Sequence, residues 1–550
     1  MVHSLGDGWE VYYGVILWSD CMQAITFLAM MCAGFSAFRR WMQQPYGKHL
    51  DVKESVGVIV PCYLPNEEPI IKDTVEHLLN NLEHVQNLTV YLVYNTPMDM
   101  PIEGDLHGMA QQYSHAEDSP RLVVRRVAKS TSKAENLNDV IKDTTEEYVA
   151  IYDADHHPEK LSLALSIWHL KNSGADCMQG STYIREGNIF FRMLICAEFF
   201  VNYFVILPAM QVVSGTGFFG GANGVWLGSS LRQLHFDPKA LTEDIDCFAH
   251  AVVEKNFKFR FLPESASGEL LPNGLTAFWK QRLRWAMGWD EVTLRHASAF
   301  WKAPGLSARR RFGLCYIFFC RWLTQLCAVC IVLFNVTAAL QLELATEAED
   351  FEKLKAPKSV KNLQFLSFCF YCVFMMVAYI MGMIHCDVKL LLGLFMYFLV
   401  MPLYVIFNTV LLTISLFRVT SGRTGGWVVT SRYTGAKKPD AQLPLLTHDD
   451  LMSTTSTSSG GKIDSCGSRI ILFFFGCMGT TVGGLVGYFW GMHLEYRPLW
   501  GWVPFGLGAT PVWVVDDNMV IAGIVIGCFS GILCYFLAAH CCRQCSSSEE

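Results

Sequence analysis

The stretch Tyr148-Val-Ala-Ile-Tyr-Asp-Ala-Asp155 ends a β-branched and aromatic run in two carboxylates that stand two positions apart. Such a run predicts a buried strand, and in extended backbone the side chains at i and i+2 point to the same side. Asp153 and Asp155 therefore predict an oxygen site for Mn²⁺ or Mg²⁺ at a strand end. A cation there would hold a diphosphate and stabilise a leaving phosphate. The alternative is a pair of carboxylates in a solvated turn or at a helix cap.

This strand is the last of four short apolar runs that alternate with helical stretches. The alternation predicts an α/β fold, in which helices cover a sheet of parallel strands. Ligands in such sheets bind beyond the carboxyl ends of the strands, where Pro61, Asn95 and Asp153 lie. The expected strands are Val56–Val60, Val90–Tyr94, Leu122–Val127 and Tyr148–Tyr152, and the expected helices include Ile70–Leu82 and Lys133–Lys142.

The composition is that of a membrane protein. Of the 550 residues, 52% are hydrophobic and only 17% are charged, so the chain is too apolar for an ordinary soluble protein. The net charge of −7 argues against a nucleic-acid partner. The 20 cysteines are scattered without the spacing of metal ligands, and we interpret them as small buried residues.

Several apolar runs reach the length of roughly 20 residues that a membrane-spanning helix needs. A further run, 388–417, is ambiguous, because a full span there would place the basic segment 418–468 outside. We interpret 388–417 as an interfacial or re-entrant helix. The expected spans are about 11–37, 313–340, 363–384, 469–491 and 515–540.

Basic residues orient these spans. Arg39 and Arg40 after the first span, and the arginine run 309–311 before the second, place residues 42–312 in the cytosol. Lysines between 353 and 361 then lie outside, which counts against this topology. The expected organisation is an N-terminal transmembrane anchor (1–41), a cytosolic α/β domain (50–300), interface and transmembrane helices (301–417), a cytosolic loop with a flexible insert (418–468), two transmembrane helices (469–540) and a cytosolic tail (541–550).

Three motifs occur in a fixed order: Asp153-Ala-Asp155, Thr242-Glu-Asp244 and Gln281-Arg-Leu-Arg-Trp285. In this order they resemble the processive branch of the family 2 glycosyltransferases, which includes cellulose, chitin and hyaluronan synthases. The resemblance covers residues 55–300, with a further match near residue 427. It implies a GT-A-type cytosolic domain inserted into an α-helical transmembrane protein, a nucleotide-sugar donor, Mn²⁺ or Mg²⁺ as cofactor, and residence in the plasma membrane.

The resemblance also implies where the donor binds. The segment Val60–Glu68 resembles the family's nucleotide-binding opening, and Ser132–Asn138 resembles its lysine motif near the diphosphate, although a lysine that opens a helix is often merely solvated. Asn95 stands where the family has an aspartate that contacts uracil, and its amide donates as well as accepts. Uridine remains the expected base. The expected donor-binding residues are Pro61, Tyr63, Glu67, Asn95, Lys133, Asp153, Gln281 and Arg284.

The catalytic pair implied by the resemblance is Glu243 and Asp244. An inverting transfer needs one carboxylate to take the proton of the acceptor hydroxyl, and we assign that task to Asp244. No nucleophile bound to the enzyme is required. The alternative is an ordinary acidic first turn of a helix, which the helix dipole favours.

The acceptor contacts are expected on a helix and a glycine-rich loop. Gln281, Arg284 and Trp285 are spaced to share one helical face, and the Trp285 indole suits the apolar face of a sugar. Gly221 and Asn223 lie in a loop that resembles the acceptor-binding loop of the synthases. The alternatives are an aromatic belt at the membrane interface and a plain turn.

The segment Gly425–Arg432 resembles the gating loop of these synthases. Glycines on its leading side would supply a hinge, and Trp427, Thr430 and Arg432 the contacts to bound donor. The alternative is a basic juxtamembrane linker that contacts lipid headgroups.

Together these features predict a membrane-embedded, inverting glycosyltransferase that transfers sugar from a UDP-sugar to a growing β-linked polysaccharide and translocates the product. The expected partners are the donor, the polysaccharide and the lipid bilayer. One alternative is a non-processive enzyme with a lipid acceptor, similar to ceramide glucosyltransferase. The other is a catalytically inactive membrane scaffold.

Overall fold

The computed structural model describes residues 50–114 and 120–327 (without 320 and 324–326), 358–384, 388–422, 492–497 and 510–515, and parts of 10–33. By its internal contacts the chain divides into two units, which we describe separately. The larger unit comprises Ile25–Ala328 and Met381–Thr447, and the other comprises Met1–Ala24, Val329–Ile380 and His448–Glu550.

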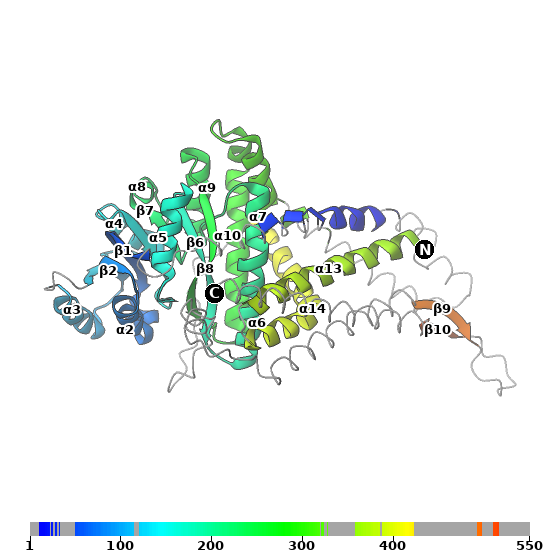
Figure 1. Ribbon diagram of the computed structural model, residues 1–550, viewed down its shortest axis with the longest axis horizontal. Coiled ribbons are helices and arrows are strands. Elements are labelled where there is room, and N and C mark those ends of the chain that lie inside the picture. The colour runs from blue at the N-terminus through cyan, green and yellow to red at the C-terminus, as the bar shows by residue number, and fades with distance from the viewer. Residues whose placement is uncertain are drawn as a thin grey trace, which may run out of the picture. The chain divides into compact units, whose positions relative to one another are not determined.

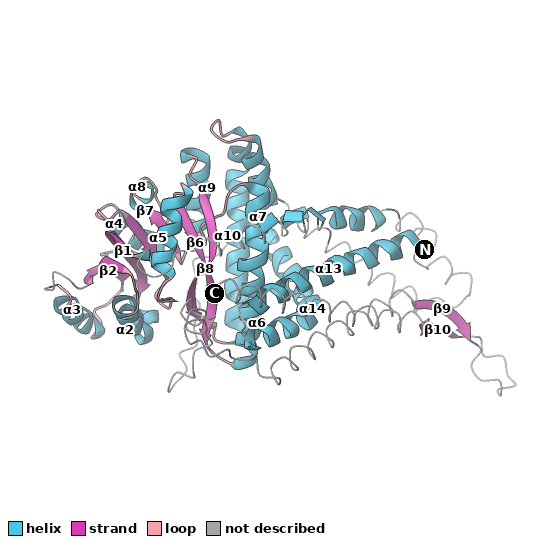
Figure 2. Ribbon diagram, in the orientation of Figure 1, coloured by secondary structure: helices cyan, strands magenta, loops and turns pink. Residues whose placement is uncertain are grey.

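The larger unit contains an eight-stranded mixed sheet with the strand order β3-β2-β1-β4-β7-β6-β8-β5 (Figures 1 and 2). The strands β1 to β4 pair in parallel, which confirms the four strands expected from the sequence and the α/β class. Strand β7 runs antiparallel to both of its neighbours and so makes the sheet mixed. The strands are β1 Val52–Tyr63, β2 Val85–Asn95, β3 Arg121–Arg126, β4 Tyr148–Ile151, β5 His157–Pro158, β6 Cys177–Glu186, β7 Gly224–Leu227 and β8 Phe259–Leu270.

Helices cover both faces of this sheet. Because side chains alternate along a strand, Val58 of β1 packs into the core on one face while Ile59 packs into the core on the other. The first core includes side chains of α2, α3 and α5, and the second includes side chains of α4, α9 and α10. These helices are α2 Leu64–Asn80, α3 Ile102–Gln112, α4 Lys133–Ile141, α5 Ser162–Ser173, α9 Glu243–Lys255 and α10 Gly274–Lys302, with the short α8 Gly228–Leu231 after β7.

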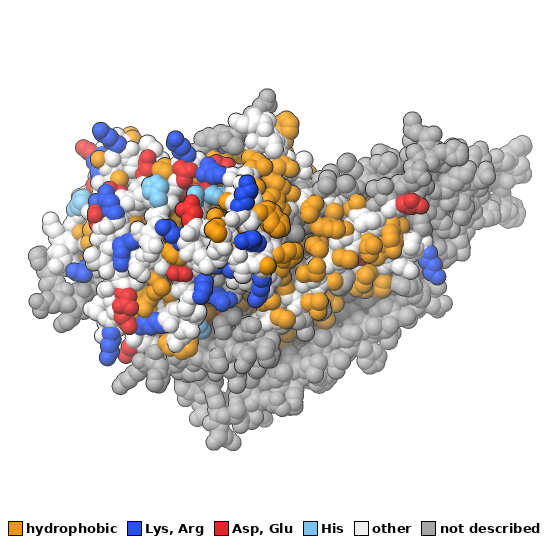
Figure 3. Space-filling view, turned by 90° about the horizontal axis from the view of Figure 1, so that it is seen from above, with side chains coloured by type: hydrophobic (Ala, Val, Ile, Leu, Met, Phe, Trp, Pro, Cys, Tyr) orange, Lys and Arg blue, Asp and Glu red, His pale blue; other side chains and the backbone are white. Residues whose placement is uncertain are grey.

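Apolar helices adjoin the α/β part. A continuous helical stretch, Ile189–Ser214, consists of α6 Ile189–Phe200, the π-helical turn η3 Val201–Ile206 and α7 Leu207–Ser214. Helix α14, Val388–Thr420, packs against α6 and α10. On the face shown in Figure 3, charged side chains are spread over the α/β part, and hydrophobic side chains gather over the helices.

Among the described residues, Ile189–Ser214 and Leu403–Thr420 are long and apolar enough to cross a membrane. The first was not among the expected spans, and 56% of its most apolar window is buried inside the protein. The second, Leu403–Thr420, lies within α14. Only 11% of its most apolar window is buried, and Leu403 and Phe417 are highly exposed. Whether the run 388–417 lies in the interface therefore stays a prediction.

Helix α13, Lys358–Ile384, covers the expected span 363–384 and belongs to the other unit as far as Ile380. The other unit also contains a hairpin of β9 Met492–Arg497 and β10 Thr510–Val515. The expected spans 469–491 and 515–540 lie outside the described residues except for residue 515, as do 423–468 and the tail 541–550. The spans 11–37 and 313–340 are described only in part.

The sheet predicts one sharp stability effect. An added Cβ at Gly180, where β6 shifts register against β8, would lie 2.2 Å from the Ser265 carbonyl oxygen and 2.4 Å from Asn223 Nδ2. We expect Gly180→Ala to lower the free energy of unfolding by about 1–3 kcal/mol. Neither the backbone carbonyl of Ser265 nor the hydrogen-bonded amide of Asn223 can move away without breaking its own contacts. Thermal unfolding of the purified chain measures this.

The matched control is Gly108→Ala in α3, where nothing lies within 4 Å of an added Cβ. This substitution should leave the melting temperature unchanged or raise it slightly, because alanine is more stable than glycine in the interior of a helix. Equal melting temperatures for the two variants would contradict the close packing at Gly180.

Candidate active site

One pocket of about 400 Å³ lies at the carboxyl ends of β1, β2 and β4 and brings most of the expected site residues together. Segments up to about 220 residues apart in sequence contribute to it, from the end of β1 to the start of α10. The expected residues that line it are Pro61, Tyr63, Glu67, Asn95, Lys133, Asp153, Asp155, Gly221, Glu243, Asp244, Gln281, Arg284 and Trp285.

Asp153 and Asp155 follow β4, as expected from the sequence. Together with His156 they place potential metal-ligand atoms within 4.8 Å of one another. Asp155 Oδ2 accepts a hydrogen bond from the backbone N–H of Leu270 at 3.1 Å, which fixes this carboxylate against β8. Carboxylate oxygens suit Mg²⁺ or Mn²⁺, so the residues present fit a divalent cation. His156 was not predicted as part of this site, although it directly follows Asp155 in the sequence.

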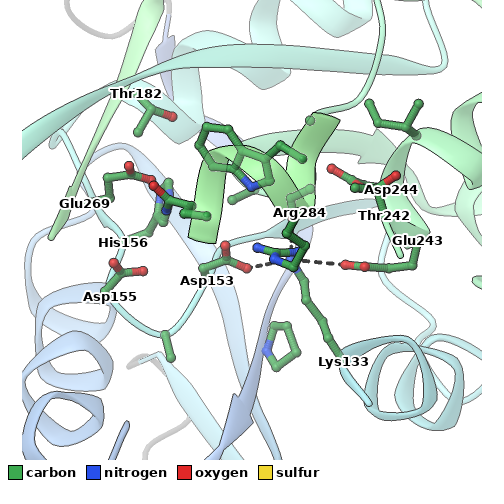
Figure 4. A pocket seen from close by; sticks show the side chains of 18 of the residues that line it. Lys133, Asp153, Asp155, His156, Thr182, Thr242, Glu243, Asp244, Glu269 and Arg284 are labelled. Atoms are coloured by element: carbon green, nitrogen blue, oxygen red, sulfur yellow. Dashed lines mark hydrogen bonds and ion pairs between the residues drawn. The ribbon is translucent and has the colours of Figure 1, made fainter. Parts of the chain in front are cut away.

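Lys133 lies at the centre of the polar groups, at the first position of α4 (Figure 4). Its Nζ donates to Asp153 Oδ1 at 2.6 Å and to the Gly221 carbonyl at 2.9 Å, and lies 3.6 Å from Glu243 Oε1. Burial alone would lower the pKa of Lys133, but Asp153 and Glu243 raise it above its ordinary value. The lysine is therefore a firmly charged ammonium that is able to bind phosphate oxygens.

Asp244 lies in the first turn of α9 beside Glu243. Burial and the neighbouring Glu243 raise the pKa of Asp244 to about 7, against the opposing effects of Lys133 and Arg284. A carboxylate that titrates near neutral pH is well suited to general-base catalysis. Gly221 is required beside it, because its φ is +87° and an added Cβ would lie 2.7 Å from Asp244 Oδ2.

The motif residues Gln281, Arg284 and Trp285 lie on α10 and line the pocket, which confirms the expected shared helical face. The Arg282 guanidinium lies 4.7 Å from the centre of the Trp285 ring, in a cation–π contact. Arg282 Nη2 also pairs with Glu198 Oε2 of α6 at 2.9 Å. Glu198 in turn accepts a hydrogen bond from the Tyr404 hydroxyl of α14 at 2.7 Å. Arg282 was not predicted as a site residue, yet its guanidinium packs against the Trp285 indole.

Asn95 is buried at the end of β2, and its amide is held by its neighbours. Nδ2 of Asn95 donates to the Ser130 carbonyl at 3.0 Å, and Oδ1 accepts from Asn136 Nδ2 at 2.9 Å. Asn136 also donates to the Cys62 carbonyl at 3.3 Å, which fixes the direction of the whole chain of bonds. The side chain of Asn95 is thus presented to the pocket in one orientation.

Asn223 lies away from the position predicted for it. It was expected to bind the acceptor, but it is fully buried and does not line the pocket. Its Nδ2 donates to the carbonyls of Ser181 at 2.7 Å and Ser265 at 2.8 Å, so the side chain joins β6 and β8. Its positive φ of 50° turns the chain into β7. The expected gating residues Trp427, Thr430 and Arg432 lie outside the described residues.

Two family models match the chain. The model described as glycosyl transferase family 2 matches residues 57–220, and that described as glycosyl transferase family group 2 matches residues 148–417. The matches therefore extend from before the pocket's first lining residue into α14.

Curated relatives are similar over about half of this chain. The "Probable glycosyltransferase YdaM" of Bacillus subtilis is 26% identical over 278 residues, which cover 48% of this chain and 61% of that protein. A "Poly-beta-1,6-N-acetyl-D-glucosamine synthase" of Staphylococcus epidermidis is 25% identical over 271 residues, which cover 47% and 61%. The chain thus spans less than two thirds of the length of these relatives.

Solved structures overlap weakly with this one. A mannosyltransferase of Pyrobaculum calidifontis, in complex with GDP-Man and Mn²⁺, has 17% identity and a TM-score of 0.40, and the overlap covers 67% of this chain and 97% of that one. Residues 1–349 of TarS of S. aureus, in complex with UDP-GlcNAc, have 12% identity and a TM-score of 0.32, with 67% and 92% covered. On these sequence matches, residues 57–417 of the chain form a glycosyltransferase family 2 region.

Proposed function

We propose that this chain is a membrane-embedded, inverting hexosyltransferase of the GT-A type. It transfers sugar from a nucleotide-sugar, with a UDP-sugar as the expected donor, to a growing β-linked polysaccharide, and it passes the product across the plasma membrane. The observation that carries this proposal is the convergence of Lys133, Asp153, Glu243, Asp244 and Arg284 in one pocket. These side chains supply cations for a diphosphate, carboxylates for a metal and a general base.

The donor would bind with its diphosphate between Lys133 and Arg284, and its base toward Asn95. Both cations line the pocket, and Lys133 is already surrounded by carboxylates that a bound cation and diphosphate would reorganise. A Mn²⁺ or Mg²⁺ held by Asp153 and Asp155 would neutralise diphosphate charge. Glu67 Oε2 accepts a hydrogen bond from the backbone N–H of Tyr63 at 3.0 Å and thereby fixes the junction of β1 and α2, where the nucleobase would bind.

The transfer would proceed in one displacement. The acceptor hydroxyl oxygen attacks the anomeric carbon, and its proton passes to an Asp244 carboxylate oxygen. The bond between the anomeric carbon and the diphosphate oxygen breaks, and the electron pair leaves with the nucleoside diphosphate. Lys133 and Arg284 stabilise the charge that develops on that leaving group. Attack from the opposite side inverts the anomeric configuration.

The acceptor would approach across Trp285 and leave along the apolar helices. Phe199, Asn202, Tyr203 and Leu207 of the stretch Ile189–Ser214 line the same pocket, so the site opens directly onto a helix that is apolar enough for a membrane. Curated relatives that bear the name of a polysaccharide synthase support a polymeric product. We further propose that Trp427, Thr430 and Arg432 close over bound donor.

Nucleotide release tests the proposed function. We expect the purified full chain in nanodiscs, with Mn²⁺ or Mg²⁺, to release nucleotide from one donor or donor pair among UDP- and GDP-sugars. Release should fall at least about 10³-fold in Asp244→Asn, because the acceptor proton then has no base. The product should be of high mass and sensitive to glycosidase.

The other functions give different results in the same assay. Turnover that depends on added lipid, with a small product, would identify a lipid transferase. A wild-type chain that binds donor but never turns over would indicate an inactive scaffold.

The rate should depend on pH through Asp244. Because the pKa of Asp244 is raised to about 7 and only the carboxylate accepts a proton, kcat/KM should fall as pH drops below about 7, approaching tenfold per pH unit. Initial rates between pH 5.5 and 8.5 measure this limb. A flat profile over that range, with chemistry rate-limiting, would remove Asp244 as the base.

Lys133 should determine donor affinity. We expect Lys133→Met to raise the donor KM by about ten- to a hundredfold, because it removes a charge-assisted contact to the diphosphate. The matched control is Lys142→Met, directly after the same helix, whose exposed ammonium pairs with Asp139 in the part of the chain that the structure describes. Calorimetric titration with nucleoside diphosphate separates binding from turnover. Equal affinity in the two variants would exclude the proposed diphosphate contact.

A further inference from the structure

The first turn of α9, which carries Asp244, is tied to α10 by a buried carboxylate that does not line the pocket. Asp246 is fully buried, and its Oδ1 accepts hydrogen bonds from His296 Nε2 at 2.9 Å and from Arg295 Nη1 at 3.1 Å. The proposed reaction uses none of these three side chains. Since burying a carboxylate is costly unless it is paired, these contacts hold the start of α9 firmly against α10.

Two further contacts join the same segments. The backbone N–H of Leu241 donates to Glu291 Oε2 of α10 at 3.2 Å. At Gly288 of α10, an added Cβ would lie 2.2 Å from Thr242 Cγ2, so the absence of a side chain there lets Thr242 lie directly on the helix. The residues on both sides of the catalytic pair, from 241 to 246, are therefore fixed to one stretch of α10, from 288 to 296.

That helix also carries the pocket residues Arg284 and Trp285, one turn before Gly288. A single rigid helix thus presents the arginine proposed to bind the diphosphate and holds the segment that bears the proposed base. The separation between the leaving-group contact and Asp244 is set by this arrangement, because one element determines both positions. Reaction rates are sensitive to such distances, and a displacement of about 1 Å can cost a hundredfold.

We propose that Asp246 is a positioning residue, which, through Arg295 and His296, holds Asp244 at its working distance and in its buried environment. This proposal rests on the proposed role of Asp244 as the base. Asp246 need not contact the substrate, and its effect on the reaction passes through the α9 backbone. Neutralising it loosens the first turn of α9 and lets water reach Asp244.

A metal site is the competing interpretation of this cluster. Asp246, His250 and His296 place ligand atoms within 4.8 Å of one another. The Arg295 guanidinium, however, already lies beside Asp246, and it also bridges to Asp237 at 2.8 Å and Glu291 at 2.7 Å. A permanent cation that is anchored on three carboxylates opposes a second cation at the same oxygens. The structure therefore favours the positioning role of Asp246 over a metal site.

The experiment compares Asp246→Asn with the control Glu254→Gln in the full chain. Glu254 lies near the far end of α9, where its exposed carboxylate contacts only His250, through Nδ1 at 2.9 Å, among the described contacts. In Asp246→Asn, Arg295 keeps Asp237 and Glu291, which limits damage to the fold. Hydrogen exchange of the amides 242–246, initial rates and their pH dependence are measured on both variants.

We expect Asp246→Asn to speed exchange at 242–246, to lower kcat about ten- to a hundredfold and to leave the donor KM within about twofold. Among the described residues, the titratable groups near Asp244 are Glu243 and Cys247 of α9, Lys133 of α4, Arg284 of α10 and Tyr203 of η3. Since these stay in place, better hydration should move the acidic limb of the rate profile to lower pH. Glu254→Gln should change none of these quantities.

A second pair of variants separates positioning from loss of fold. His296→Gln keeps an N–H donor for Asp246, whereas His296→Leu removes it. Activity and exchange should be retained in the first and altered in the second, with nucleotide binding intact in both.

The proposal is overturned if Asp246→Asn exchanges and turns over like Glu254→Gln, or if its only effect is a lower melting temperature. Binding of one equivalent of Zn²⁺ by the wild type, lost in His250→Ala, would replace it by the metal site. A wild-type chain without turnover would reject only the proposed function. Hydrogen exchange at 242–246 would still test whether Asp246 holds the first turn of α9.

Discussion

The balance of charge around Lys133 is the constraint on which the rest of the site depends. Asp153, Glu243 and Asp244 come from two separate elements and approach one another in a largely buried pocket. Carboxylates so placed repel one another and lose hydration, so they need a cation among them. The ammonium of Lys133 supplies it, and Arg284 adds a second positive group on the side of α10.

This balance leaves Asp244 with a raised pKa. Lys133 bonds directly to Asp153 and lies close to Glu243, whereas Asp244 feels it only at longer range. Burial and the charge of Glu243 therefore prevail at Asp244 and raise its pKa to about 7. One lysine thus pairs with Asp153, beside the proposed cation site, and leaves Asp244 as a carboxyl group that exchanges protons near neutrality.

Helix α10 connects this charge balance to the apolar helices. Its side chains at 281, 284 and 285 enter the pocket, while Arg282 reaches Glu198 of α6. One turn beyond Trp285, the buried Asp290 accepts hydrogen bonds from Arg321, from Trp322 at 2.8 Å and from Ser415 of α14. Helix α10, which positions the reacting groups, is thus also bonded to the apolar helices α6 and α14.

Much of this was determined by local sequence. The alternation in Tyr148–Asp155 and the spacing of Gln281, Arg284 and Trp285 depend on backbone periods of two and 3.6 residues, which act within a few positions. The first four strands, the paired carboxylates at the end of β4 and the shared helical face could therefore be predicted. The tertiary structure decided what depends on distant partners: the antiparallel entry of β7, the burial of Asn223 between β6 and β8, and the pKa of Asp244. The first two depend on backbone partners tens of residues away, and the raised pKa of Asp244 depends on the burial that the folded pocket imposes on it. The free energy of such burial and pairing exists only once the chain has folded.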